Sequence, residues 1–196
     1  MTVRKIVKYG TPSLREKSKE VHKISKKVQI LVDDLYDTLY AANGVGLAAP
    51  QIGENLRVFV IDVGMDAKTM NPITFINPKI LKKEGAVNSY EGCLSFPEAY
   101  TNVRRYSYVK VKALDIKGRP FILEASEGSL LARAIQHEFD HLDGVLFIDH
   151  SRNRFEADKI LTEKGLNPID AKYLLEETEL EEEIQKQPVQ EEKKID

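Results

Sequence analysis

The chain has 196 residues, 42% of them hydrophobic and 31% charged, and a formal net charge of −2. This length suffices for one domain with a sizeable hydrophobic core but is too short for two domains that would each have one. The net charge gives no reason to expect direct nucleic acid binding. The single cysteine excludes an intrachain disulfide framework, and the chain shows neither a signal core nor a run of about 18 apolar residues, so we expect a cytoplasmic protein that makes no membrane contact.

The first predicted element is an amphipathic helix over residues 24–42, whose apolar residues recur at helical spacing until Asn43-Gly44 ends it. The next residues, 44–49, fit the Gly-x-Gly-x-x-Ala pattern of dinucleotide sites. However, that pattern must follow a strand and open a helix, whereas here a helix precedes it and Pro50 stands where the new helix should continue. Glycines also let another chain approach the backbone closely, so an extended peptide could pair at this segment.

Strands are expected after Gly53. Residues 56–63 form a β-branched run, residues 65–71 read as a loop, and residues 74–76 and 80–81 begin the next strands. Residues 108–115 alternate apolar with polar side chains and turn at Lys117-Gly118 into residues 120–124, which predicts a hairpin. This pattern predicts an α+β fold, with antiparallel or mixed sheets packed around a buried metal-binding α-helix.

That helix carries the segment Gln136-His137-Glu138-Phe139-Asp140-His141. Four residues advance a helix by about one turn, so His137 and His141 share a face on which two imidazoles can bind one metal ion. Glu138, beside the first histidine, can reach a water on that metal without being a ligand. Ser129 is the expected N-cap and Gly144 the expected end of the helix.

A catalytic metal usually takes three protein ligands and keeps one position open. The pattern His-Glu-x-x-His-x-x-Gly-x-x-His places the third ligand at Phe147, which binds no metal, and His150 comes three residues too late. A glutamate on a later helix, Glu156 or Glu163, is a second solution, although their charged segment favours solvated helix faces.

The remaining candidate is the only cysteine, Cys93, whose thiolate would be a strong, soft ligand. Its surroundings, residues 91–95 (Glu-Gly-Cys-Leu-Ser), together with residues 136–141 and 44–53, resemble bacterial peptide deformylase. The three blocks stand in the order of that family, and the similarity covers about residues 3–150. The resemblance implies a hydrolase that removes the N-formyl group from the formylmethionine of newly made polypeptides and releases formate.

The resemblance also implies which residues act. One divalent metal ion is expected on Cys93, His137 and His141; Fe2+ is the expected ion, and Zn2+, Ni2+ or Co2+ are possible substitutes. The implied catalytic groups are the Glu138 carboxylate, the Gln51 amide and the Leu94 backbone N–H. The implied contacts to formylmethionyl peptides and nascent chains are Gly44, Val45, Gly46, Gly92, Leu130, Arg133 and Ala134. A charge cluster of Glu91, Arg105 and Asp140 would orient the metal ligands.

Some positions depart from common patterns of the family. Ser89 stands where an apolar side chain is frequent, and Tyr100 and Arg104 differ near the substrate channel, so the side-chain preference after formylmethionine stays open. Two alternatives remain beside the deformylase. One is a zincin-type metallopeptidase that cuts internal bonds, and the other is a non-catalytic fold whose structural metal takes a fourth ligand from His150 or Glu91.

The end of the chain differs in composition from the rest. Residues 154–164 predict a short charged helix ended by Gly165, and Asp170 could cap another helix through Leu175. Residues 176–196 hold nine acidic and three basic side chains. We therefore expect a single catalytic domain over residues 1–165 and a helical, acidic and partly disordered tail over residues 166–196.

Overall fold

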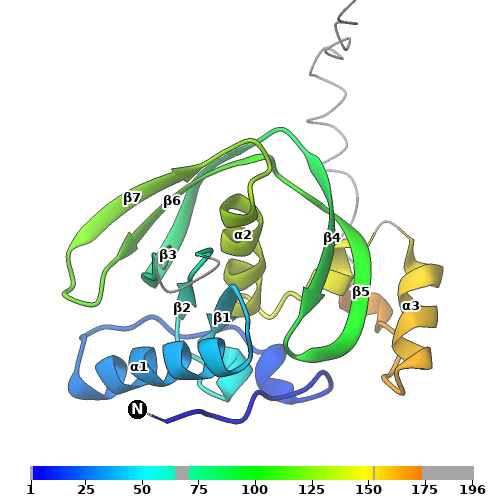
Figure 1. The fold of residues 1–196 in the computed structure, drawn as a ribbon, viewed down its shortest axis with the longest axis horizontal. Helices are drawn as coiled ribbons and strands as arrows, with labels where there is room; N and C mark the ends of the chain where they lie inside the picture. The colour runs from blue at the N-terminus through cyan, green and yellow to red at the C-terminus, as the bar shows by residue number, and fades with distance from the viewer. Residues whose placement is uncertain (1, 65–70, 152, 174–196) are drawn as a thin grey trace, which may run out of the picture.

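In the computed structural model, residues 2–64, 71–151 and 153–173 are described, and they form an α+β fold (Figure 1). The predicted fold class is therefore confirmed. The helices are α1 (Lys26–Ala41), α2 (Leu130–Leu142) and α3 (Arg154–Glu163). The strands are β1 (Gly46–Ala48), β2 (Val58–Ile61), β3 (Ile73–Glu84), β4 (Val87–Cys93), β5 (Phe96–Arg105), β6 (Tyr108–Leu114) and β7 (Pro120–Ala125).

The strands form two antiparallel sheets, one of five strands in the order β1-β2-β3-β6-β7 and one of two strands, β4-β5. Strand β2 is buried on both faces, which explains why its sequence is apolar without alternation. Val58 and Val60 belong to the core cluster under α1, whereas Phe59 and Ile61 belong to the cluster that includes α2. The larger sheet is therefore covered by a helix on each face.

Helix α2 lies at the centre of the molecule, between the β6–β7 side of the larger sheet and the β4–β5 hairpin (Figure 1). Both predicted ends are confirmed. The Ser129 hydroxyl accepts a hydrogen bond from the Ala132 N–H (3.3 Å). At the other end Gly144 has φ +73°, and an added Cβ would lie 2.5 Å from the Arg15 carbonyl oxygen. Both the left-handed backbone conformation and the lack of space therefore disfavour any residue with a side chain at this position.

Two features differ from the sequence-based expectation. Residues 74–76 and 80–81 belong to one strand, β3, because register shifts between Ile76 and Lys79 and between Ile80 and Lys82 absorb the break in the alternation. The β4–β5 hairpin was not predicted, because polar residues and Pro97 interrupt its pattern and its pairing comes from tertiary contacts. The expected loop over residues 65–71 lies outside the described residues except for Asn71.

Helix α3 and its end at Gly165 (φ +69°) agree with the prediction. Beyond it, Ile169 is buried in a third core cluster with Phe96 and Phe147. Asp170 precedes a short 3-10 turn, Ala171–Tyr173, and the predicted continuation through Leu175 and the acidic tail lie outside the described residues. The proposed domain boundary at residue 165 stays a prediction.

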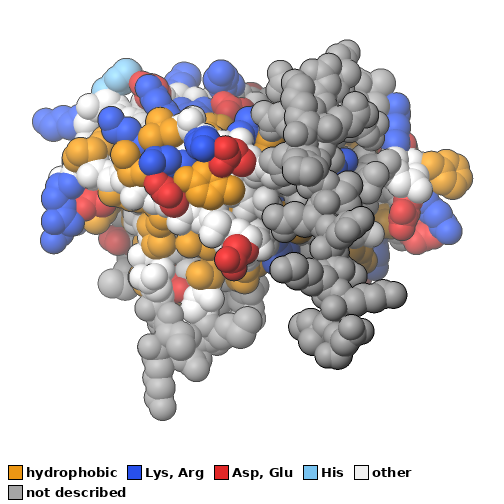
Figure 2. Space-filling model, turned by 90° about the horizontal axis from the view of Figure 1, so that it is seen from above, with side chains coloured by type: hydrophobic (Ala, Val, Ile, Leu, Met, Phe, Trp, Pro, Cys, Tyr) orange, Lys and Arg blue, Asp and Glu red, His pale blue; other side chains and the backbone are white. Residues whose placement is uncertain are grey.

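Side chains of both charges are interspersed on the surface. Figure 2 shows Lys and Arg among Asp, Glu and hydrophobic side chains on the face seen from above. Neighbouring surface charges form ion pairs, such as Lys82 with Glu84 and the half-buried Lys110 with Glu124, each at 2.7 Å. Within the described part of the chain, every helix is too short or too polar to cross a membrane.

Candidate metal centre

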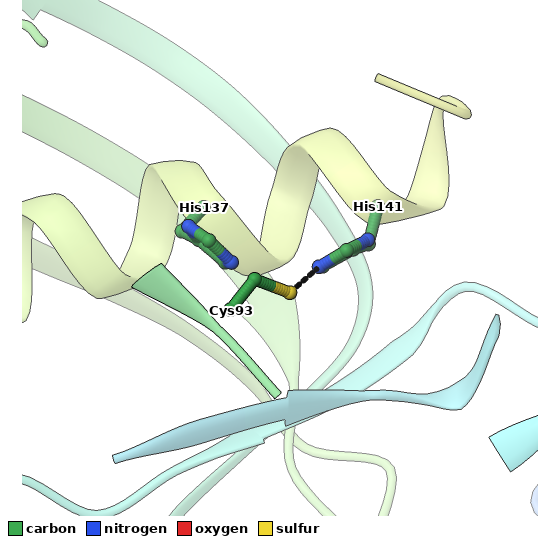
Figure 3. Close-up of side chains that lie close together, drawn as sticks. All are labelled: Cys93, His137 and His141. Atoms are coloured by element: carbon green, nitrogen blue, oxygen red, sulfur yellow. Dashed lines mark hydrogen bonds between the residues drawn. The ribbon is translucent and has the colours of Figure 1, made fainter. Parts of the chain in front are cut away.

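One sulfur and two imidazoles converge between β4 and α2 (Figure 3). Cys93 is the last residue of β4, and His137 and His141 come from successive turns of α2. The Cys93 Sγ lies 3.3 Å from the His141 Nε2, and the three potential ligand atoms all lie within 4.8 Å of one another. The structure therefore brings together the three residues that were expected to bind metal.

The donor atoms fit a divalent transition metal. Bonds of about 2.0 to 2.3 Å in a tetrahedral site place a sulfur and a nitrogen roughly 3.5 Å apart, close to the distance between Cys93 and His141. The His137 Nδ1 is occupied by Glu91 at 3.1 Å, which leaves its Nε2 for a metal. Burial holds the pKa of His141 well below its ordinary value, so His141 is neutral and able to coordinate a cation.

A buried charge cluster orients His137. Arg105 donates to both carboxylate oxygens of Glu91, at 3.0 and 2.9 Å, and also to Asp140, as predicted from the sequence. His150 joins the cluster through its Nε2, which lies 2.8 Å from Asp140. Burial by itself would raise the pKa of Glu91, but Arg105 and His137 lower it to about 2, so Glu91 stays an anion that fixes the His137 ring.

Glu138 presents a carboxyl group that the rest of the described structure leaves partly unpaired. The residue is 4% exposed, and its Oε2 has no hydrogen-bond partner among the described residues. Its Oε1 lies against Gly46 of β1, where an added Cβ would be only 2.5 Å away. Burial raises the pKa of Glu138 to about 7, which suits a group that must both accept and donate a proton near neutral pH.

Gln51 has a fixed amide orientation. Its Oε1 accepts a hydrogen bond from the buried Ala48 N–H at 2.8 Å, so its Nε2 must point the other way. That nitrogen lies 3.4 Å from both the Cys93 Sγ and the Ser95 Oγ. The side chain therefore aims a donor at the metal centre, as an oxyanion-stabilising role requires.

A cleft of about 490 Å³ opens above these groups. The residues expected from the sequence that line it are Gly44, Val45, Gly46, Gln51, Gly92, Cys93, Leu94, Leu130, Arg133, Ala134, His137 and Glu138. His141 is 1% exposed and is not part of the lining. Other lining residues were not predicted, because they lie outside the motif blocks that carry the resemblance: Lys8, Asn43, Tyr90, Phe96, Pro97 and Glu98.

Two strand edges border the cleft. Strand β1 is the end strand of the larger sheet, and β4 pairs only with β5, so each has a second edge unpaired within the described structure. Residues of both edges line the cleft: Gly46 on one side, preceded by Val45, and Tyr90 and Gly92 on the other. An extended peptide in the cleft could therefore hydrogen-bond to backbone on both sides.

The alternative ligands lie elsewhere. Phe147 is buried and its ring stacks on His137, with centroids 5.9 Å apart. Glu156 and Glu163 are exposed on α3, and His150 is bound to Asp140. Among residues 2–64, 71–151 and 153–173, the only group that could hold a metal is therefore Cys93, His137 and His141.

Ser89 is buried beside the cleft. Its hydroxyl accepts a hydrogen bond from the Arg133 Nη1 at 2.8 Å, and the Arg133 Nε donates to the Gly128 carbonyl oxygen at 3.2 Å. The polar side chain at this position thus fixes the arginine that lines the cleft wall.

Comparisons with known proteins agree on one family. A sequence model described as "Polypeptide deformylase" matches residues 3–156. The chain is 51% identical over 149 residues to Peptide deformylase 1 of Clostridium acetobutylicum, covering 76% of this chain and 95% of the relative. It is 45% identical over 165 residues to Peptide deformylase 1 of Bacillus subtilis, covering 84% of this chain and 100% of the relative.

Solved structures give the same result. The peptide deformylase from Synechococcus elongatus in complex with actinonin superposes with a TM-score of 0.81 at 39% identity, covering 88% of this chain and 91% of that one. A peptide deformylase from Legionella pneumophila superposes with a TM-score of 0.78 at 41% identity, covering 84% and 94%.

Proposed function

This chain belongs to the polypeptide deformylase family and is a metal-dependent hydrolase that removes the N-formyl group from formylated peptides, and on that premise we propose which of its residues perform the reaction. The observation that supports the proposal is the convergence of Cys93, His137 and His141 in a cleft bordered by two open strand edges.

The metal ligands are Cys93, His137 and His141. When bound there, a divalent cation supplies Lewis-acid chemistry, polarising the formyl carbonyl and lowering the pKa of water. We propose Fe2+ as the ion used by the protein because the family resemblance implies it. Zn2+, Ni2+ or Co2+ are substitutes, since a soft thiolate and two imidazoles can bind each of these metals. Glu91 and Arg105 hold the His137 ring in the orientation that leaves its Nε2 free.

Glu138 is the proton carrier. Its carboxylate takes a proton from the water that attacks the formyl carbon, and it later gives this proton to the amine nitrogen as the C–N bond breaks. The products are formate, which contains the oxygen of that water, and a peptide with a free amino terminus. A single group can serve both steps because burial holds its pKa near the pH at which it works.

The Gln51 Nε2 and the Leu94 backbone N–H stabilise the oxygen that becomes negative during the attack. The Gln51 amide is preorganised by Ala48, so it does not reorient during the reaction. Such donors are worth roughly 3 to 4 kcal/mol each at comparable sites.

The substrate is an extended formylmethionyl peptide, as on a nascent chain. Its backbone pairs with Gly44, Val45 and Gly46 on one side and with Gly92 on the other. The methionine side chain lies against the wall formed by Leu130, Arg133 and Ala134, all of which line the cleft. We also propose the cytoplasm as its compartment, where nascent chains are made and reducing conditions protect the Cys93 thiolate.

The test is an anaerobic formate-release assay on formyl-Met-Ala-Ser with iron-loaded or nickel-loaded protein. We expect turnover by the wild type, loss of turnover with retained metal in Glu138→Ala, and loss of bound metal in Cys93→Ser. Glu163→Ala, an exposed glutamate on α3, is the matched control and should behave as the wild type.

The same experiment separates the alternatives. A zincin-type metallopeptidase would cut internal bonds of unformylated peptides and would keep its metal in Cys93→Ser. A structural metal site would show no turnover of either kind. Absence of formate from metal-replete wild type would contradict the proposal.

A further inference from the structure

Two exposed tyrosine rings stack beside the cleft, on the β4–β5 hairpin. Tyr90 is 66% exposed and Tyr100 is 50% exposed, and their ring centroids lie 5.8 Å apart with an interplanar angle of 19°. Tyr100 is opposite Gly92 in the ladder, and its ring covers Gly92 so closely that an added Cβ would lie 2.4 Å from Cε1. The pair therefore stands at the strand edge that is proposed to receive the substrate.

The position of the metal centre sets the direction in which a substrate runs. Strand β4 ends at Cys93, so the formyl group must lie at that end of the strand. The remainder of the peptide then extends back along β4, antiparallel to it, past Gly92 and towards Tyr90. With a rise of roughly 3.3 Å per residue, the residue after formylmethionine lies alongside Gly92, next to both rings.

Side chains alternate across an extended chain, so the first two substrate side chains point to opposite faces. The methionine side chain points inward, towards the wall that contains Leu130 and Ala134. On β4, Glu91 points inward as well, since it is 8% exposed and bound to Arg105, whereas Tyr90 belongs to the opposite face. The second substrate side chain therefore shares a face with Tyr90 and Tyr100.

We propose that Tyr90 and Tyr100 form a platform that favours substrates with a large apolar or aromatic residue directly after formylmethionine. The inference rests on the proposed function of the cleft. Two stacked rings offer a broad apolar surface that a phenylalanine or leucine side chain can cover, while a serine leaves it in water. An aromatic contact of this kind is expected to change kcat/KM by about twofold to tenfold, where a tenfold change corresponds to 1.4 kcal/mol of binding free energy.

The test compares formyl-Met-Phe-Ser with formyl-Met-Ser-Ser, using metal-replete protein and formate release as the readout. We expect the wild type to prefer the phenylalanine peptide by at least about threefold in kcat/KM, mainly through a lower KM. Tyr90→Ser and Tyr100→Ser should each reduce this ratio, and the double variant should bring it close to one. Tyr90→Phe and Tyr100→Phe keep the rings and should keep the ratio.

Phe155→Ser is the matched control. Phe155 is an aromatic residue on α3 that is 82% exposed and does not line the cleft, so its removal should leave the ratio unchanged. A wild-type ratio of one, or a ratio that survives the loss of both tyrosines, would overturn the inference while leaving the deformylase assignment intact. If the wild type released formate from neither peptide, the proposed function would fail, and the inference with it.

Discussion

Gly46→Ala should damage the reaction without touching any proposed metal ligand. Gly46 lies in β1, and its φ is not in the left-handed region, so alanine adds no backbone strain. The added Cβ would instead meet the Glu138 carboxylate, at 2.5 Å from Oε1 and 2.9 Å from Cδ. Because non-bonded heavy atoms pack at roughly 3.5 Å, the carboxylate must move by about 1 Å.

A displacement of about 1 Å in a catalytic group can cost roughly 100-fold in rate, equivalent to about 2.7 kcal/mol. We therefore expect kcat for formate release from formyl-Met-Ala-Ser to fall by about two orders of magnitude. Metal content should stay at the wild-type level, since Cys93, His137 and His141 are unchanged. The assay combines steady-state kinetics, metal analysis and thermal unfolding of the same preparations.

Two companion variants make the result specific. In Gly44→Ala the new Cβ would meet the Cδ1 atoms of Leu39 and Leu94, at 2.8 and 2.9 Å, rather than the carboxylate, so we expect a smaller loss of kcat. Glu138→Asp shortens the side chain, so it should cost less in the Gly46→Ala background than in the wild type, giving a measurable coupling. A folded, metal-replete Gly46→Ala protein with wild-type kcat would refute the reasoning.

Three further predictions concern the surroundings of the centre. Gln51→Leu should lower kcat by about 100-fold to 1000-fold, because the hydrogen-bond donor to the oxyanion is lost. Gln51→Glu keeps the acceptor for the Ala48 N–H, so comparing the kinetics and the denaturation of the two variants separates the effect on catalysis from the effect on stability. Equal kcat in Gln51→Leu and wild type would contradict the oxyanion role. Arg105→Met leaves the buried Glu91 and Asp140 without their cation and should lower the free energy of unfolding, measured by urea denaturation, by about 3 to 5 kcal/mol. Arg154 is an exposed arginine in an ion pair with Asp158, and Arg154→Met should change the free energy of unfolding by less than about 1 kcal/mol. Similar losses in both variants would count against a stabilising role of the buried cluster. Removing the metal with a chelator should lower Tm by about 10 °C, and adding the metal back should restore it. A Tm that does not change when the metal is removed would argue against a metal site in the folded protein.

Local sequence patterns determined much of this protein. The helical repeat places His137 and His141 on one face whatever the rest of the chain does, and Ser129 and Gly144 delimit that helix through their own backbone and side-chain chemistry. The alternation over residues 108–115 and the turn at Lys117-Gly118 likewise predicted the β6–β7 hairpin. The third ligand was different: the zincin spacing fell on Phe147, which binds no metal, so a later glutamate and Cys93 stayed open, and the family resemblance selected Cys93.

The tertiary structure decided how distant segments meet. It brings Cys93 to the two histidines through a hairpin that has no clear strand pattern, and it sets Gly46 against Glu138 and the Gln51 amide against Ala48. It also places the rings of Tyr90 and Tyr100 together at the edge of the cleft. Helix periodicity and caps act between residues a few positions apart, so a sequence displays them directly. The approach of two strands or of a strand and a helix depends on which buried surfaces fit together, and no single segment contains that information.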